Sequence, residues 1–147
     1  MNELIVVRGG GDIATGTIHR LVRCGYKVIV TEVENPSAIR RKVAFCEAVF
    51  DKEVFVDGVG CKKISSLEQA EKVFSENKAA LIVDPKCKMI DKIKPDILID
   101  GILAKKNLGT TKDIDVYKRQ FRLTIGPRSF VEKSPYILIS LIFFILL

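Results

Sequence analysis

Three consecutive glycines directly after a short apolar run constrain this chain more than any other feature. The run, residues 4–7, belongs to a predicted strand at 4–8, and Gly9, Gly10 and Gly11 follow that strand. Together with Ala14 they fit the G-x-G-x-x-G/A pattern of a strand that turns tightly into a helix. In that pattern the second glycine lets a pyrophosphate approach the backbone, and the helix amides point at the anion. The turn therefore predicts binding of a nucleotide or another phosphate-bearing ligand, with Arg8 and Asp12 flanking it.

The next predicted strand, residues 27–32, ends in a carboxylate that matches this pattern. Glu32 stands 18 positions after Ala14, which is the spacing required of a carboxylate that accepts bonds from ribose hydroxyls. The alternative is a glycine-rich turn that binds nothing, with Glu32 a solvated strand end.

Apolar runs and helix-period segments alternate along residues 1–113. The spacing predicts strands at 4–8, 27–32, 54–56, 61–64, 79–83 and 96–100, with helices at about 12–24, 35–44 and 67–76. The run at 79–83 is apolar throughout, as in a parallel strand covered on both faces. Alternation of this kind predicts the α/β class, with a doubly wound, mostly parallel, Rossmann-like sheet and right-handed crossovers.

The first two predicted helices have assignable faces. In the first, Ile18 and Leu21 are expected to face the sheet, and Thr15 and His19 the opposite side. The second helix is expected to start at Asn35-Pro36 and to carry a basic stretch beginning at Arg40. That stretch is either a solvated face or a patch toward an anionic ligand or an acidic partner.

Two further predicted strands end in carboxylates. Asp84 precedes a proline, and Asp100 precedes Gly101. Because ligands of parallel sheets lie beyond the carboxyl ends of the strands, both carboxylates are candidate site residues. Capping or turn roles are the alternative for both. A polar stretch soon after Asp100 either neutralises a phosphate or forms a solvated turn; it contains Lys105, Lys106 and Asn107.

Composition excludes several classes of protein. The formal charge is +6, but acidic residues are interleaved with the basic ones and tryptophan is absent, so we expect no nucleic-acid binding. The four cysteines form no C-x-x-C pair, so we expect free thiols, a cytoplasmic location and no metal site; a soft-metal or redox role for one cysteine is the alternative. Residues 1–3 lead straight into the first strand without a secretory pattern.

Three stretches carry a resemblance to a known family. They are residues 6–16, residues 32–41 and residues 100–107. Together they resemble the YqeB-type accessory proteins of the selenium-dependent molybdenum hydroxylase system, which are related to the Rossmann half of XdhC-like factors. The resemblance runs from about residue 2 to residue 113.

The resemblance implies a maturation role. The ligand would be the molybdenum cofactor, a pterin nucleotide, and the partner a molybdenum hydroxylase apo-enzyme; a homodimer is an open option. It implies no defined reaction and therefore no catalytic residue. The implied binding positions are Arg8, Gly9, Gly10, Gly11, Asp12, Glu32, Asn35, Pro36, Arg40 and residues 100–107. From the glycine pattern alone, the alternatives are an NAD(P)-dependent oxidoreductase and a regulatory module that senses NAD(H).

Residues 114–147 depart from the resemblance. Residues 115–120 match the translated end of a transposase adapter, and residues 135–147 are almost all apolar. Thirteen residues fall short of the roughly 20 that span a bilayer as a helix. We therefore expect one Rossmann-like cofactor-binding domain at 1–113 and an artefactual or chimeric tail at 114–147. A peripheral membrane anchor is the alternative for the tail.

Overall fold

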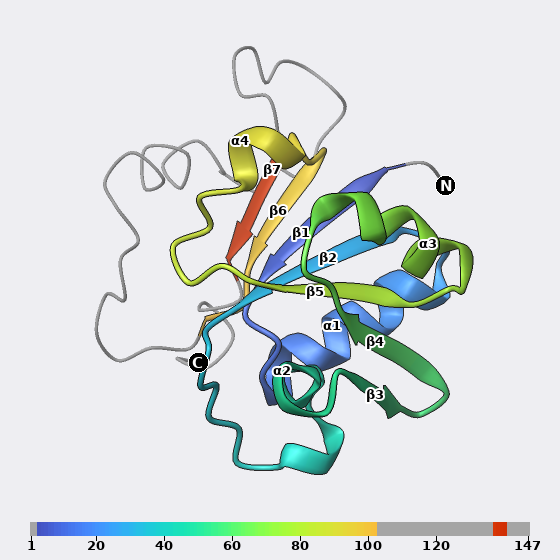
Figure 1. Ribbon diagram of the computed structural model, residues 1–147, viewed down its shortest axis with the longest axis vertical. Coiled ribbons are helices and arrows are strands. Elements are labelled where there is room, and N and C mark those ends of the chain that lie inside the picture. Colours follow the sequence, from blue (N-terminus) through green and yellow to red (C-terminus); the bar gives the residue numbers. More distant parts are fainter. Residues whose placement is uncertain (1–2, 103–136, 141–147) are drawn as a thin grey trace, which may run out of the picture.

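One seven-stranded sheet organises the chain in the computed structural model, which describes residues 3–102 and 137–140 (Figure 1). The strands are β1 (Leu4–Arg8), β2 (Lys27–Glu32), β3 (Glu53–Val56), β4 (Val59–Lys63), β5 (Ala79–Val83), β6 (Ile97–Asp100) and β7 (Ile137–Ser140). The helices are α1 (Asp12–Arg23), α2 (Ala48–Asp51), α3 (Ala70–Ser75) and α4 (Ile90–Ile93), with 3-10 turns η1 (Arg41–Val43), η2 (Phe45–Glu47) and η3 (Leu67–Gln69).

The strand order is β3-β4-β5-β2-β1-β6-β7. Every neighbouring pair is parallel except the β3–β4 hairpin. The predicted α/β class with a mostly parallel, Rossmann-like sheet is thus confirmed. Strand β1 lies between β2 and β6. The chain therefore adds strands first on the β2 side of β1 and later on the β6 side, which makes β1 the switch point of the strand order. Ligands of doubly wound sheets bind at such a switch point, beyond the carboxyl ends of the strands.

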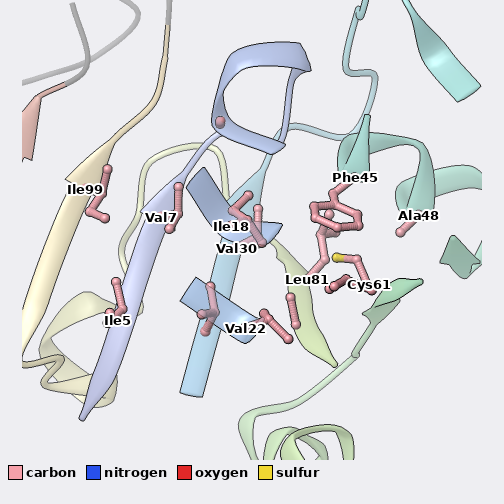
Figure 2. Close-up of a cluster of buried hydrophobic side chains, with 14 of the residues drawn as sticks. Ile5, Val7, Ile18, Val22, Val30, Phe45, Ala48, Cys61, Leu81 and Ile99 are labelled. Carbon is pink, nitrogen blue, oxygen red and sulfur yellow. The ribbon is translucent and has the colours of Figure 1, made fainter. Parts of the chain in front are cut away.

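Each face of the sheet buries its own apolar layer. On one face, α1 and the η2–α2 segment cover alternate residues of the strands, including Val7, Val30 and Leu81 (Figure 2). On the other face, α3 and α4 cover the intervening residues, including Val6 and Ile29. Two-sided burial explains the uninterrupted apolar runs in the sequence, because neither face of the central strands meets water.

The buried face of α1 differs in part from the prediction. Thr15 is buried, and Val22 rather than Leu21 is the deeply buried residue of the last turn. The Thr15 hydroxyl donates to the carbonyl of Gly10 (3.1 Å) and accepts from the amide of Phe45 (2.9 Å). A buried threonine is stable here because both hydrogen-bonding functions of its hydroxyl have partners.

The prediction of a helix at 35–44 was wrong. Residues 33–40 hold no regular element, and the short turns η1, η2 and α2 follow. The amide of Cys46 donates to the carbonyl of Gly10 (2.8 Å), while Phe45 is fully buried beside α1. These distant contacts replace the local bonds that a continuous helix would make, so tertiary packing overrides helical periodicity.

Among residues 3–102 and 137–140, every helix falls short of the length and apolar character needed to cross a membrane.

Candidate functional site

The three glycines of the turn between β1 and α1 lie in three different surroundings. Gly9 has φ of 84°, in the region where only glycine is comfortable, and its amide donates to Thr31 O (2.8 Å). A Cβ at Gly10 would lie 3.0 Å from the Cys46 nitrogen, so this position is filled by protein. A Cβ at Gly11 would have no neighbour within 4 Å among the described residues. Only Gly11 therefore borders space that a ligand could use.

Glu32 is part of the glycine turn and not a solvated strand end. Its Oε2 accepts from the Gly10 amide (2.7 Å), and its Oε1 accepts from the Val33 amide (2.9 Å). An ionised carboxylate has about four acceptor sites. Acceptor capacity therefore remains for ribose hydroxyls, although the carboxylate also holds the turn in shape.

Asp12 adds a second negative charge at the first residue of α1. Its Oδ2 lies 3.9 Å from Nε of the exposed Arg40, and its buried Oδ1 has no hydrogen-bond partner among the described residues. The helix dipole favours a carboxylate at this end. The negative field extends to Cys46: burial, followed by Glu32, Glu47 and Asp12, raises the pKa of its thiol to about 11. Arg40 is the cation at ion-pair distance from Asp12 in this part of the described chain.

Strands β1 and β6 approach each other very closely at the switch point. The Gly101 amide donates to Arg8 O (2.9 Å), and a Cβ at Gly101 would lie 2.9 Å from the Ala14 Cβ. The small residue at position 14 thus has the packing role that its motif predicts, with the chain just after β6 as its neighbour. Ala14 and Gly101 therefore pack against each other and offer no functional side chain to a ligand.

Three other predicted residues, Arg8, Asp84 and Asp100, lie on the opposite face of the sheet. The guanidinium of Arg8 and the carboxylate of Asp100 are buried there, with Nη1 and Oδ2 separated by 3.8 Å. Asp100 Oδ1 also accepts from the Ile102 amide (3.1 Å). Asp84 caps the segment after β5, because its two oxygens accept from the amides of Lys88 and Met89 (3.0 and 2.8 Å).

The predicted binding residues therefore form two groups. Gly11, Asp12, Glu32 and Arg40 gather at the α1 face, whereas Arg8, Asp84 and Asp100 belong to the α3–α4 face. Asn35 is exposed and Pro36 buried, and neither makes a side-chain hydrogen bond or ion pair within the described chain. Lys105, Lys106 and Asn107 lie outside the described residues.

Sequence reasoning missed Thr31 and Cys87, which lie beside Arg8 on the α3–α4 face. The Thr31 hydroxyl points to the Cys87 sulfur (4.0 Å), and both residues are buried. The available signal was strand alternation: Arg8 is in register with Thr31 on β2 and with Asp100 on β6. Residues in register on parallel strands share a face, so three polar strand ends form one row.

Other features of the described chain do not add to this site. Two hollows of about 230 and 330 Å³ lie near the amino ends of β2 and β5, and Val22, Gly25 and Asn77 line both. Cys24 is exposed and the other three cysteines are buried, all with free thiols. Within residues 3–102 and 137–140, no three His, Cys, Asp or Glu side chains are grouped to hold a metal ion.

Comparison with known proteins finds one informative similarity. The chain is 46% identical over 113 residues to the protein named "Uncharacterized protein YqeB" of Escherichia coli (strain K12). The match covers 77% of this chain but 21% of that protein, so the chain spans about a fifth of the length of this curated relative. No family profile and no solved structure matches the chain. The comparison thus supports the YqeB part of the sequence resemblance over most of the chain.

Proposed function

We propose that this domain binds a phosphate-bearing cofactor at the glycine turn, as part of an accessory protein for maturation of a selenium-dependent molybdenum hydroxylase. The observation that carries the binding proposal is the open space at Gly11. It lies at the N-terminus of α1, which has 12 residues. Helix amides without intrahelical partners face this space and favour an anion.

The residues around Gly11 fit a nucleotide. A phosphate would take the amides at the start of α1, and a ribose would donate to the fixed carboxylate of Glu32. Arg40, with a side chain 71% exposed beside Asp12, would offset the negative charge of the two carboxylates. The pterin nucleotide of the molybdenum cofactor combines phosphate and ribose, and it supplies the redox chemistry of the hydroxylase once inserted.

The maturation role rests on the sequence resemblance and on the similarity to YqeB. In this role the cofactor-loaded domain would meet the molybdenum hydroxylase apo-enzyme in the cytoplasm. This chain's own residues would hold the cofactor by its phosphate and ribose and leave the rest of it accessible to the recipient.

An NAD(P)-dependent oxidoreductase or an NAD(H)-sensing module is the second candidate, favoured by the position of Glu32 at the end of β2. An oxidoreductase also needs a proton donor near the cofactor. His19 does not meet that need: it lies on α1, with Nε2 3.3 Å from the carbonyl of Asp57 in the β3–β4 turn. Of these two, the sensing module fits the described residues better.

Binding titrations with NAD, NADP and a molybdopterin dinucleotide test the proposal. We expect Gly11→Val to abolish binding with little change in stability, because the branched side chain would fill the ligand's space. Gly16→Val is the matched control, since a Cβ at Gly16 on α1 also meets nothing within 4 Å in the described part of the chain. Equal affinities in wild type and both variants would show that the turn is only structural. Tightest binding of NAD would favour the sensing module.

A further inference from the structure

Arg8 is a buried cation whose hydrogen bonds are incomplete. Its exposed fraction is 1%, and neither Nη1 nor Nη2 has a hydrogen-bond partner among the described residues. The carboxylate of Asp100 stands 3.8 Å from Nη1, which is an ion-pair distance but too long for a hydrogen bond. Burying a charged group without hydrogen bonds is costly, and buried polar groups are nearly always satisfied.

The surroundings of Arg8 are those of a small polar site. Thr31 and Asp100 flank it in register on the neighbouring strands, at exposed fractions of 3% and 2%. Cys87 lies within reach of the same charge: burial raises the pKa of its thiol, and the guanidinium opposes that rise. This row ends the apolar layer of the α3–α4 face at the carboxyl ends of three strands, where parallel sheets bind ligands.

We propose that Arg8 receives a small oxyanion, a carboxylate or a phosphate group, in this row on the α3–α4 face. A guanidinium presents its two terminal nitrogens as a fork that matches both anions, and the Thr31 hydroxyl adds a donor beside it. The inference goes beyond the proposed function, which places its phosphate on the opposite face, before Gly11. Because Arg8 is closed off from solvent, the anion enters when the segment after β5, which carries Cys87, opens.

The test follows the Nε–Hε signal of Arg8 by NMR while acetate or phosphate is added to the full chain. Sodium chloride at matched ionic strength is the reference, and Arg8→Lys identifies the signal. We expect one of the two anions to shift the signal saturably and to raise the melting temperature. Arg8→Lys keeps the charge but loses the fork, so its affinity should fall about tenfold or more.

Two further variants separate this site from the glycine turn. Arg8→Met combined with Asp100→Leu removes both buried charges, an exchange that proteins often tolerate; it should abolish the response to the anion. Arg20→Met, an exposed arginine on α1, should leave the response unchanged. Loss of the response in Gly11→Val alone would place the anion at the glycine turn and overturn the inference. So would the absence of any response beyond that to sodium chloride.

Discussion

Alanine at Gly10 and alanine at Gly11 should affect stability very differently, although the two glycines are adjacent. A Cβ at Gly10 would lie 3.0 Å from the Cys46 backbone nitrogen and 3.3 Å from Cγ1 of Val30. The nearer atom is backbone, so the segment around Cys46 must move, and overpacking of this kind costs about 1–3 kcal/mol. The movement also weakens the bonds of Gly10 to Cys46 and Glu32, at about 0.5–1.5 kcal/mol. We expect Gly10→Ala to lower the free energy of unfolding by about 2–4 kcal/mol.

Gly11→Ala should be nearly neutral for stability. The φ of Gly11 is −69°, which any residue adopts, and the position is open. Alanine restricts the unfolded chain but is a poorer N-cap than glycine, so the two effects offset to within about 0.5 kcal/mol. Urea unfolding followed by circular dichroism measures both variants, provided that the m-values stay equal. Equal destabilisation by the two substitutions would refute the assignment of packing to Gly10 and ligand space to Gly11.

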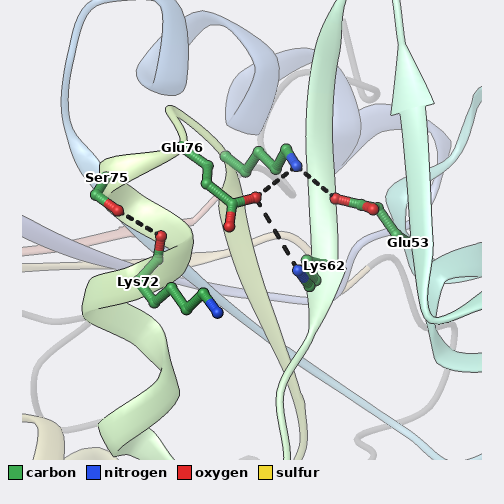
Figure 3. A network of polar contacts seen from close by, with 6 residues as sticks. Glu53, Lys62, Lys72, Ser75 and Glu76 are labelled. Carbon is green, nitrogen blue, oxygen red and sulfur yellow. Dashed lines mark hydrogen bonds and ion pairs between the residues drawn. The ribbon is translucent and has the colours of Figure 1, made fainter.

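Three other expectations rest on single side chains. Glu32→Ala should lower the affinity for a ribose-bearing nucleotide by about ten- to hundredfold. It should also reduce the preference of the site for that nucleotide over its 2′-phosphorylated form. It should also lower stability, because the Gly10 amide loses its acceptor; unchanged affinity for both nucleotide forms in a folded variant would remove ribose recognition. Cys24 should be the first thiol to react with an alkylating reagent at pH 8, because the other cysteines are buried and burial raises their pKa values; mass spectrometry locates the label, and first labelling elsewhere would contradict the described burial. Lys78→Met should reduce the loss of stability on acidification below pH 4.5, since a hydrogen bond from Lys78 lowers the pKa of Glu76; Figure 3 shows the Glu76 carboxylate, which also faces Lys62. A stabilisation tied to a depressed carboxylate pKa is present above pH 4.5 and lost as the pH falls. Urea unfolding at several pH values measures the effect, and identical pH profiles for the two proteins would show that solvent screens the pair.

The strand pattern of the sequence was sufficient for the sheet because burial and periodicity agree there. Residues 28–30 and 79–83 are apolar in uninterrupted runs, and the strands that contain them, β2 and β5, are central parallel strands covered on both faces. The only predicted helix that failed, at 35–44, lies where partners far along the chain determine the structure. Phe45 and Cys46 bind Thr15 and Gly10, some 30 residues earlier, and no local pattern reveals such pairings.

The candidate site was predicted only in part for a related physical reason. Strand ends gather at one edge of a parallel sheet, and Glu32, Asp84 and Asp100 do lie at or just after the carboxyl ends of β2, β5 and β6. Side chains alternate between faces along a strand, however, and this divides the set. Arg8 precedes Gly9 directly, yet it points to the α3–α4 layer. Nor does residue type distinguish a carboxylate that caps amides, as Asp84 does, from one that is available to a ligand.

Truncation after residue 113 tests whether the tail belongs to the domain. The sequence alone predicts that removal of the apolar tail improves solubility, because exposed apolar stretches promote aggregation. In the structure, β7 lies within this tail and pairs with β6 in parallel, from Ile97 with Ile137 to Asp100 with Ser140. Removal of β7 would expose the edge of β6 beside the buried Arg8–Asp100 pair, and an unpaired edge strand is itself an aggregation risk. Urea unfolding and light scattering of the 113-residue and full-length proteins decide between the two. A less stable, aggregating short form would show that β7 stabilises the sheet. A stable, monodisperse short form would show that the domain folds without β7.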